Sequence, residues 1–216
     1  MTKALHKEIL RLKKSVLEMA QLARKMLEDS IQALLTQDVD LANEVDQRKH
    51  QLKDFDYGIE ERTLRLLTLH QPMAKDMRRV ATILKVITYL TRIGRYGKDI
   101  ANVAMQLKDK ANAKRIVNLI HMWEHVEVMI KKAIQGFDDS KIQYLEDFTE
   151  RDDEVDQLRW SVFRECVTYM MEDPKCITPC SHYIMVARYL ERCGDHACKI
   201  SEKVHYMVTG EHVEIS

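Results

Sequence analysis

The clearest pattern along the chain is a stripe of apolar residues within its first 36 positions. Steps of four and three residues separate its members, which are Leu5, Ile9, Leu12, Val16, Met19, Ala23 and Met26. Such steps place every member on one face of an α-helix, because 3.6 residues complete a turn. The stripe therefore predicts a long amphipathic helix over residues 3–36, in which about thirty residues would span roughly 45 Å at 1.5 Å per residue.

Polar breaks and a proline predict three further helices in the middle of the chain. A break at 36–38 precedes a second helix over about 39–69. Pro72 suits the first turn of a third helix that runs to about Leu107, since the N–H that proline lacks has no partner there. A turn at 108–112 leads to a fourth helix, whose apolar face comprises Ile116, Trp123, Val126, Ile130, Ala133 and Phe137.

The remaining segments predict a fifth and a sixth helix. Gly136 and the polar run 138–140 indicate the end of the fourth helix and the N-cap of a fifth, over about 141–171. Asp173 and Pro174 are typical of an N-cap and first turn, and they begin a sixth helix that ends near Gly210. No segment alternates apolar and polar residues long enough to predict a strand.

A short phrase occurs twice and divides the chain into two halves. Tyr89-Leu90-Thr91-Arg92-Ile93-Gly94-Arg95 returns one hundred positions later as Tyr189-Leu190-Glu191-Arg192-Cys193-Gly194-Asp195. Each copy lies in the proline-started third helix of its half, which indicates a duplicated unit. We therefore predict an all-α fold of two tandem three-helix bundles, similar to spectrin repeats, over residues 1–108 and 109–216.

Composition and charge limit the kinds of partner and the cellular location that we expect for this protein. The 34 basic and 34 acidic residues are interspersed and give a formal net charge of zero. This argues against a nucleic-acid partner, which usually leaves a basic stripe on the sequence. No apolar run approaches the ~20 residues of a membrane span, and the first residues lack an apolar signal core. We expect a cytoplasmic protein.

All five cysteines lie in the second half. They are Cys166, Cys176, Cys180, Cys193 and Cys198. Their helical spacings differ from those of zinc ribbons and fingers, although a thiolate metal site is an alternative. We expect reduced, buried thiols that pack as small apolar side chains.

Carboxylates in the second half form a candidate cation site. Glu191 and Asp195 are four residues apart and share a helix face, as do Asp152 and Asp156. If the fifth and sixth helices are antiparallel neighbours, the two pairs can face each other, and a cation would offset their mutual repulsion. Oxygen ligands favour magnesium, manganese or iron, with zinc as an alternative. The competing interpretation pairs the acids with Arg188, Arg192 or Arg159.

Three further residues extend this candidate site. Asp153 and Glu202 would add carboxylate oxygens, and His196 would act as a ligand or would orient one.

Several stretches resemble the PhoU family, the accessory proteins of phosphate-specific transport. The stretch 190–197 (LERCGDHA) is similar to the acidic signature that each of the family's two three-helix bundles carries. Further similar stretches are 71–78 (QPMAKDMR), 152–156 (DDEVD), 169–174 (YMMEDP) and 206–211 (YMVTGE). Their order and spacing extend the resemblance over nearly the whole chain.

The resemblance implies a function, which the spacing of apolar residues does not indicate. It implies a non-enzymatic, negative regulator of phosphate uptake and of the phosphate-starvation response. The implied partners are a phosphate ABC transporter at the cytoplasmic face of the membrane, a membrane sensor kinase and a second copy in a homodimer. The family's metal clusters imply Asp152, Asp153, Asp156, Glu191 and Asp195 as ligands, with iron or zinc favoured over manganese or magnesium.

The first half departs from the family pattern. Alignment of the halves places Lys49, His50 and Lys53 opposite the acids that begin the fifth helix, while Thr91 and Arg95 replace Glu191 and Asp195. A cation cluster is therefore not expected in this half. Either Lys53 and Arg95 pair with local carboxylates such as Asp56, Glu60 or Asp99, or Lys49, Lys53 and Arg95 form an anion site that takes phosphate.

Other constellations carry weaker signals. His121 and His125 share a helix face, which can bind zinc, but no HExxH motif accompanies them. Glu202-x-x-His205 is a single ExxH, whereas di-iron bundles use two such motifs. The alternatives to a phosphate regulator are a metal-binding helical scaffold outside phosphate control and a carboxylate-metal enzyme.

Overall fold

The computed structural model describes residues 3–108 and 117–215, and nearly all of this part of the chain is helical. Within it the helices are α1 (Lys3–Thr36), α2 (Val39–His70), α3 (Lys75–Gln106), α4 (Val117–Asp139), α5 (Phe148–Glu172) and α6 (Ile177–Thr209). Two single 3₁₀ turns, η1 (Gln143–Leu145) and η2 (Pro174–Cys176), precede α5 and α6. The prediction of an all-α fold is confirmed.

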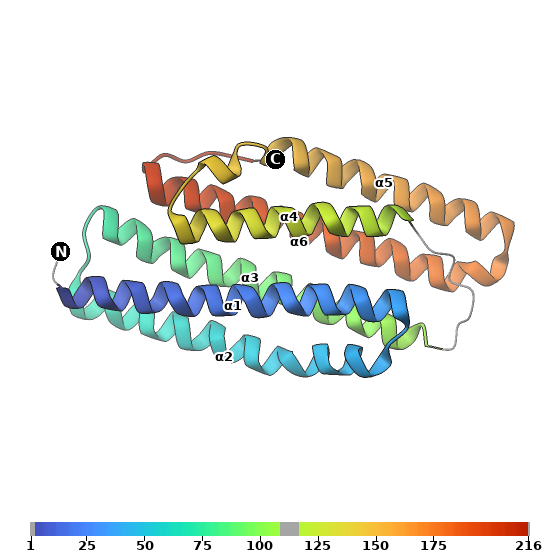
Figure 1. Ribbon diagram of the computed structural model, residues 1–216, viewed down its shortest axis with the longest axis horizontal. Coiled ribbons are helices and arrows are strands. Elements are labelled where there is room, and N and C mark those ends of the chain that lie inside the picture. The colour runs from blue at the N-terminus through green and yellow to red at the C-terminus, as the bar shows by residue number, and fades with distance from the viewer. Residues whose placement is uncertain (1–2, 109–116, 216) are drawn as a thin grey trace.

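The helices form two bundles that lie side by side along their lengths (Figure 1). Helices α1, α2 and α3 pack against one another, and so do α4, α5 and α6. The two bundles meet mainly where α3 packs on α6, with α1 and α4 also in contact. The predicted boundary after residue 108, most of the predicted turn at 108–112 and Ile116 lie outside the described residues.

The apolar stripe of α1 is buried as its spacing predicts. Its seven members, Leu5 to Met26, are at most 6% exposed, and Met19, Ala23 and Met26 are fully buried. Each fully buried leucine, isoleucine, valine or methionine contributes about 1.5–3 kcal/mol relative to an exposed one. The stripe therefore holds α1 against α2 and α3 along its whole length.

The start of the third helix differs from the prediction. α3 begins at Lys75, three residues after Pro72. Gln71, with φ 43°, ends α2 in the left-handed conformation, and its N–H donates to the Leu67 carbonyl. Pro72 thus follows a helix end, where proline is common because it cannot continue the helix, and it disfavours helical backbone at the preceding residue.

The start of the fifth helix was also predicted wrongly. α5 begins at Phe148 rather than near residue 141, because the preceding segment folds back on α4 and buries Leu145 and Phe148. Gly136 permits this approach, since a Cβ there would lie 3.2 Å from the Lys141 carbonyl oxygen. Helix α6 begins at Ile177 rather than at Pro174, because the Asp173 carboxylate accepts from Lys175 N at 2.9 Å and caps the 3₁₀ turn η2 instead.

The interface between the bundles repeats a pair of aromatic contacts. Tyr89 of α3 stacks on His196 of α6 with ring centroids 5.8 Å apart, and Tyr189 of α6 stacks on Tyr96 of α3 at 5.6 Å. A shift of one hundred residues converts the first pair into the second. The repeated helices therefore pack on each other with approximate two-fold symmetry.

Candidate functional site

The acidic residues of the second bundle lie where α5 crosses the middle of α6. A Cβ at Gly194 of α6 would lie 3.7 Å from Val155 and 3.9 Å from Asp152 Oδ1, so the second turn of α5 faces this glycine. The Cys198 thiol donates to Asp152 Oδ1 over 3.5 Å and joins the two helices. A hollow of about 480 Å³ opens beside them, with Asp195 in its wall.

Negative charge accumulates around Asp152. Burial raises the pKa of its carboxyl above the usual range, and the carboxylates of Asp195, Asp156 and Asp153 raise it further, against the opposing hydrogen bond from Cys198. The structure therefore brings acids of α5 and α6 within electrostatic reach of one another, as the spacing predicted.

Glu191 has a different environment. It is 8% exposed. Burial is the main reason for its raised pKa, and Asp195 and Asp156 add to the effect. Two guanidinium groups oppose it, because Arg188 hydrogen-bonds both carboxylate oxygens from the same helix and Arg159 Nε of α5 lies 3.4 Å from Oε1. This is the arginine pairing that the sequence left as the competing interpretation.

The remaining acids do not converge on a single point. Asp195 accepts from Arg192 Nη1 at 2.9 Å, while Asp153 and Asp156 are exposed on α5. Across residues 3–108 and 117–215, no three His, Cys, Asp or Glu side chains stand close enough to share a metal ion. The acids are near enough to affect one another's ionisation, but their side chains are not arranged as a preformed set of metal ligands.

The other suggested ligands differ in their relation to the acidic cluster. The Glu202 carboxylate pairs with Lys199 at 2.8 Å and accepts from Ile215 N at 3.1 Å. The His196 ring stacks on Tyr89 and Tyr96, and burial lowers its pKa. His196 also lines the hollow that Asp152 and Asp195 line, so it stands beside the acidic cluster.

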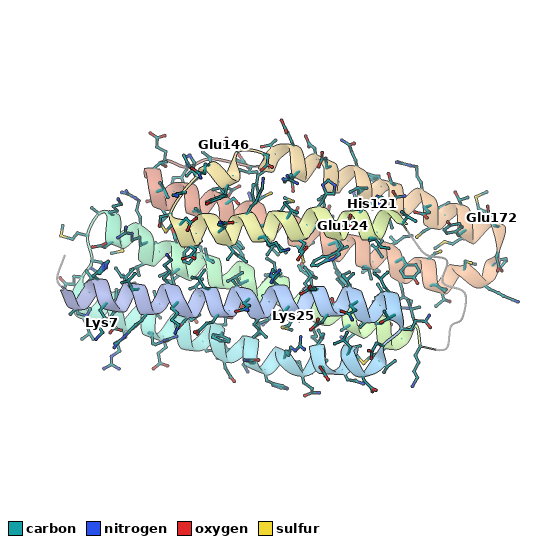
Figure 2. The ribbon with its side chains drawn as sticks, viewed as in Figure 1. Lys7, Lys25, His121, Glu124, Glu146 and Glu172 are labelled. Carbon is teal, nitrogen blue, oxygen red and sulfur yellow. The ribbon has the colours of Figure 1, made fainter. Side chains whose placement is uncertain are left out.

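The two histidines of α4 point to different environments. Figure 2 shows His121 and Glu124 on α4, and both are exposed to solvent. His125 Nδ1 instead lies 2.9 Å from the Glu154 carboxylate of α5. The pair is thus divided between solvent and a neighbouring helix.

The five cysteines are buried and form no disulfide with one another, as predicted. What the sequence missed is the role of Cys198, whose thiol contacts the Asp152 carboxylate across two helices. A contact between residues 46 positions apart has no local signal. The stacked tyrosines were also missed, although their signal was available because Tyr89 and Tyr189 begin the two copies of the repeated phrase.

The structure brings the basic residues of the first half together at the equivalent place. A Cβ at Gly94 would meet Leu52, just as one at Gly194 would meet Val155, so an offset of 103 residues relates α2 to α5. This supports the alignment of Lys49 and Lys53 with Asp152 and Asp156. One hollow of about 530 Å³ lies between α2 and α3. The residues that line it include Lys49, Lys53, Arg95 and Thr91.

The donor set of the second bundle suits a hard cation in chemistry but is not arranged for one. Asp152, Asp156 and Asp195 supply oxygens from two helices, and a cation would offset the repulsion that, after the larger effect of burial, helps to raise the pKa of Asp152. Asp195 would have to leave Arg192, however, and Glu191 would have to leave two arginines.

Comparison with known proteins gives one consistent family. The PhoU domain matches this chain twice, over residues 16–104 and 119–204. The phosphate-specific transport system accessory protein PhoU homolog of Rhizobium meliloti is 34% identical over 208 residues, which cover 96% of this chain and 88% of that protein. The homolog from Aquifex aeolicus is also 34% identical, over 97% of this chain and 95% of that protein.

Two crystal structures share the whole fold. PhoU from Pseudomonas aeruginosa superposes with a TM-score of 0.91 at 33% identity and covers 95% of this chain and 99% of that one. The phosphate transport system regulatory protein PhoU from Streptococcus pneumoniae gives a TM-score of 0.88 at 26% identity, over 97% and 99% of the two chains. The tandem arrangement of two PhoU domains is thereby confirmed.

Proposed function

The chain belongs to the PhoU family of non-enzymatic accessory and regulatory proteins of phosphate transport, and we propose that it restrains phosphate uptake by contacting the transporter itself. The observation that carries this proposal is the match of both bundles, in order, to relatives named as accessory proteins of the phosphate-specific transport system. We place the contact at the cytoplasmic face of a phosphate ABC transporter. No helix in the described ranges is long and apolar enough to cross a membrane.

Phosphate uptake by a bacterium that lacks its own PhoU protein tests this function. In phosphate-rich medium, such cells producing this chain should take up radiolabelled phosphate more slowly than cells with an empty vector. The transporter subunits should also co-purify with a tagged copy of the chain. Unchanged uptake, with the protein present at normal levels and folded, would contradict the proposal.

Membership of the same family is the basis for proposing two more specific partners. We propose a membrane sensor kinase as a second partner, through which the chain would restrain the phosphate-starvation response, and a homodimer as the working form. Crosslinking in cells followed by mass spectrometry would identify both, because residues of the kinase or of a second copy would be joined to defined lysines of this chain. Absence of both crosslinks while transporter crosslinks form would limit the role to uptake.

We further propose that the acidic cluster holds a hard cation in the working protein. Asp152, Asp156 and Asp195 would be the principal ligands, with Asp153 and Glu191 adding oxygens after Glu191 leaves its arginines. The proximity of the acids supports the proposal, because, beside the larger effect of burial, the carboxylates of Asp195, Asp156 and Asp153 raise the pKa of Asp152. Iron or zinc is favoured, with manganese or magnesium as alternatives, and the cation would fix the crossing of α5 and α6.

Metal content tests this second proposal. Protein purified without affinity metals should contain at least about one equivalent of metal by mass spectrometry, as expected for carboxylate ligands shared by one ion. The Asp195→Ala variant should lose it and stay helical by circular dichroism. An Asp99→Ala variant, which removes a carboxylate from the first bundle instead, should keep it. Metal-free wild-type protein would overturn the cation site.

A further inference from the structure

The hollow of the first bundle is lined mainly by positive charge. Its walls come from α2 and α3, and its volume is about 530 Å³. Four cationic side chains line it, Lys49, Lys53, Arg95 and Lys98, against the two carboxylates of Asp56 and Asp99. A concave surface with an excess of one charge concentrates ligands of the opposite charge.

Two of these cations have no carboxylate at ion-pair distance among the described residues. Lys49 pairs with Asp46 at 2.7 Å, and Lys98 lies 3.3 Å from Asp99. Lys53 instead lies over the ring of Tyr57, 5.3 Å from its centroid. Within the described ranges neither Lys53 nor Arg95 forms an ion pair. Burial raises the pKa of Asp56, but Arg95 is near enough to oppose that effect, so the predicted pairing is found only as a longer-range attraction between Arg95 and Asp56.

A buried hydroxyl faces the same hollow. Thr91 is 7% exposed, and its Oγ1 makes no hydrogen bond of normal geometry to any described residue. The Asp56 carboxyl is close enough for this hydroxyl to lower its pKa, although burial has the larger effect and leaves the pKa raised. A buried hydroxyl without a full hydrogen bond is uncommon, since buried polar groups are normally paired.

We propose that this hollow binds a phosphate group, held by Lys53 and Arg95 with the Thr91 hydroxyl as a third donor. Arginine presents a planar fork of N–H groups to phosphate oxygens, and lysine adds a point charge. The phosphate group belongs to free inorganic phosphate or to a small phosphate ester such as a nucleotide, since the hollow has room for either. Asp56 opposes the anion but is outweighed by the cations around it.

The proposal is independent of both the transporter contact and the cation site. It is carried by the charges of α2 and α3, whereas the cation site belongs to α5 and α6. Failure of phosphate binding would therefore leave the uptake and metal measurements unaffected.

Isothermal titration calorimetry on the full chain in low-salt buffer tests the site, with inorganic phosphate as the probe. The double variant Lys53→Gln/Arg95→Gln should bind at least about tenfold more weakly than wild type, since it loses two charge-assisted contacts. Asp56→Asn should bind more tightly, because it removes an opposing charge. Lys85→Gln, at an exposed position of α3 outside the hollow, should bind as wild type does.

Parallel titrations with ADP distinguish the two sources of the phosphate group. Equal affinities for both ligands would identify free phosphate, and tighter binding of ADP that the double variant loses would identify a nucleotide. Absence of binding by either ligand at several millimolar would overturn the proposal. So would equal losses in the double variant and in Lys85→Gln, with all variants folded by circular dichroism.

Discussion

The third helix of the first bundle carries Thr91 and Arg95 where the third helix of the second bundle carries Glu191 and Asp195. The neighbouring helices differ in the same sense, since α2 has Lys49 and α5 has Asp152. The charges at these corresponding positions are thus inverted while the backbones correspond. Packing is therefore maintained by residues other than these charged ones.

The buried positions explain why the fold tolerates this inversion. Leu90 and Leu190 of the repeated phrase are both fully buried. Leu52 and Val155 occupy equivalent places against Gly94 and Gly194. Because apolar and small residues set the distance between helices, residues at the rim can change charge at little cost in stability. The packing of the two bundles therefore does not require the same charges in the two hollows.

Among equivalent positions of the two bundles, Gly97 should show the largest effect of substitution on the free energy of unfolding. A Cβ there would lie 2.9 Å from the backbone atoms Leu27 N and Met26 C of α1, whereas the second bundle has a fully buried alanine, Ala197, at the equivalent place. Gly97→Ala should lower the free energy of unfolding by about 2 kcal/mol, because backbone atoms cannot move aside singly. Urea denaturation followed by circular dichroism measures the change.

Ala197→Gly is the matched control for that substitution. It should cost only about 1 kcal/mol, through the greater backbone freedom of glycine in the unfolded chain. A Gly97→Ala protein as stable as wild type would show that α1 and α3 can separate freely. The close approach of these helices would then not distinguish the two bundles.

Gly94 and Gly194 should respond to alanine with opposite signs. At Gly94 a Cβ would lie 2.5 Å from Leu52 Cδ2, and Leu52 is itself buried in the core. At Gly194 the nearest atom would be 3.7 Å away, an ordinary contact. We expect Gly94→Ala to destabilise by about 1 kcal/mol and Gly194→Ala to stabilise by up to about 1 kcal/mol through helix propensity.

Thermal denaturation of the two single variants measures both changes in stability. The change in the double variant should equal the sum of the two. A loss of stability in both single variants would indicate that α5 lies closer to α6 than the structure shows.

The smallest effect concerns the pH dependence of Asp56, whose counterpart in the second bundle is Arg159. Burial, with Glu60 adding to it, raises the pKa of the Asp56 carboxyl above 3.8 in the folded protein. An acid with a raised folded pKa destabilises the fold as pH rises through that pKa, and it has no effect below the unfolded value. Asp56→Asn should therefore be more stable than wild type at neutral pH, by roughly 0.5 kcal/mol after solvent screening.

Denaturation midpoints at pH 7 and near pH 3 measure this difference, which should disappear at the lower pH because both proteins are then neutral at residue 56. The exposed Asp54→Asn variant of the same helix is the control and should show little pH-dependent difference. A stabilisation by Asp56→Asn that persists at low pH would have a cause other than charge.

The sequence predicted the helices well where the signal was periodic. The stripe of α1 is buried as expected, since spacing alone decides which residues share a helix face. Within the described part of α4, the predicted apolar face is buried except for Trp123, which is partly buried. Helix starts were less predictable. The segment before α5 is not α-helical, because Leu145 and Phe148 are buried in the core, a contact that no local pattern reveals.

The sequence by itself determined the duplication, the acidic pairs of the second half and their replacement by basic and neutral residues in the first. These features depend only on residue types and on their spacing along the chain. Only the tertiary structure decided which charges meet. Arg159 of α5 reaches Glu191 of α6, whereas Lys53 and Arg95 form no ion pair among the described residues. The physical reason is that ion pairs between helices depend on the distance and register of two helices, which their separate sequences do not specify.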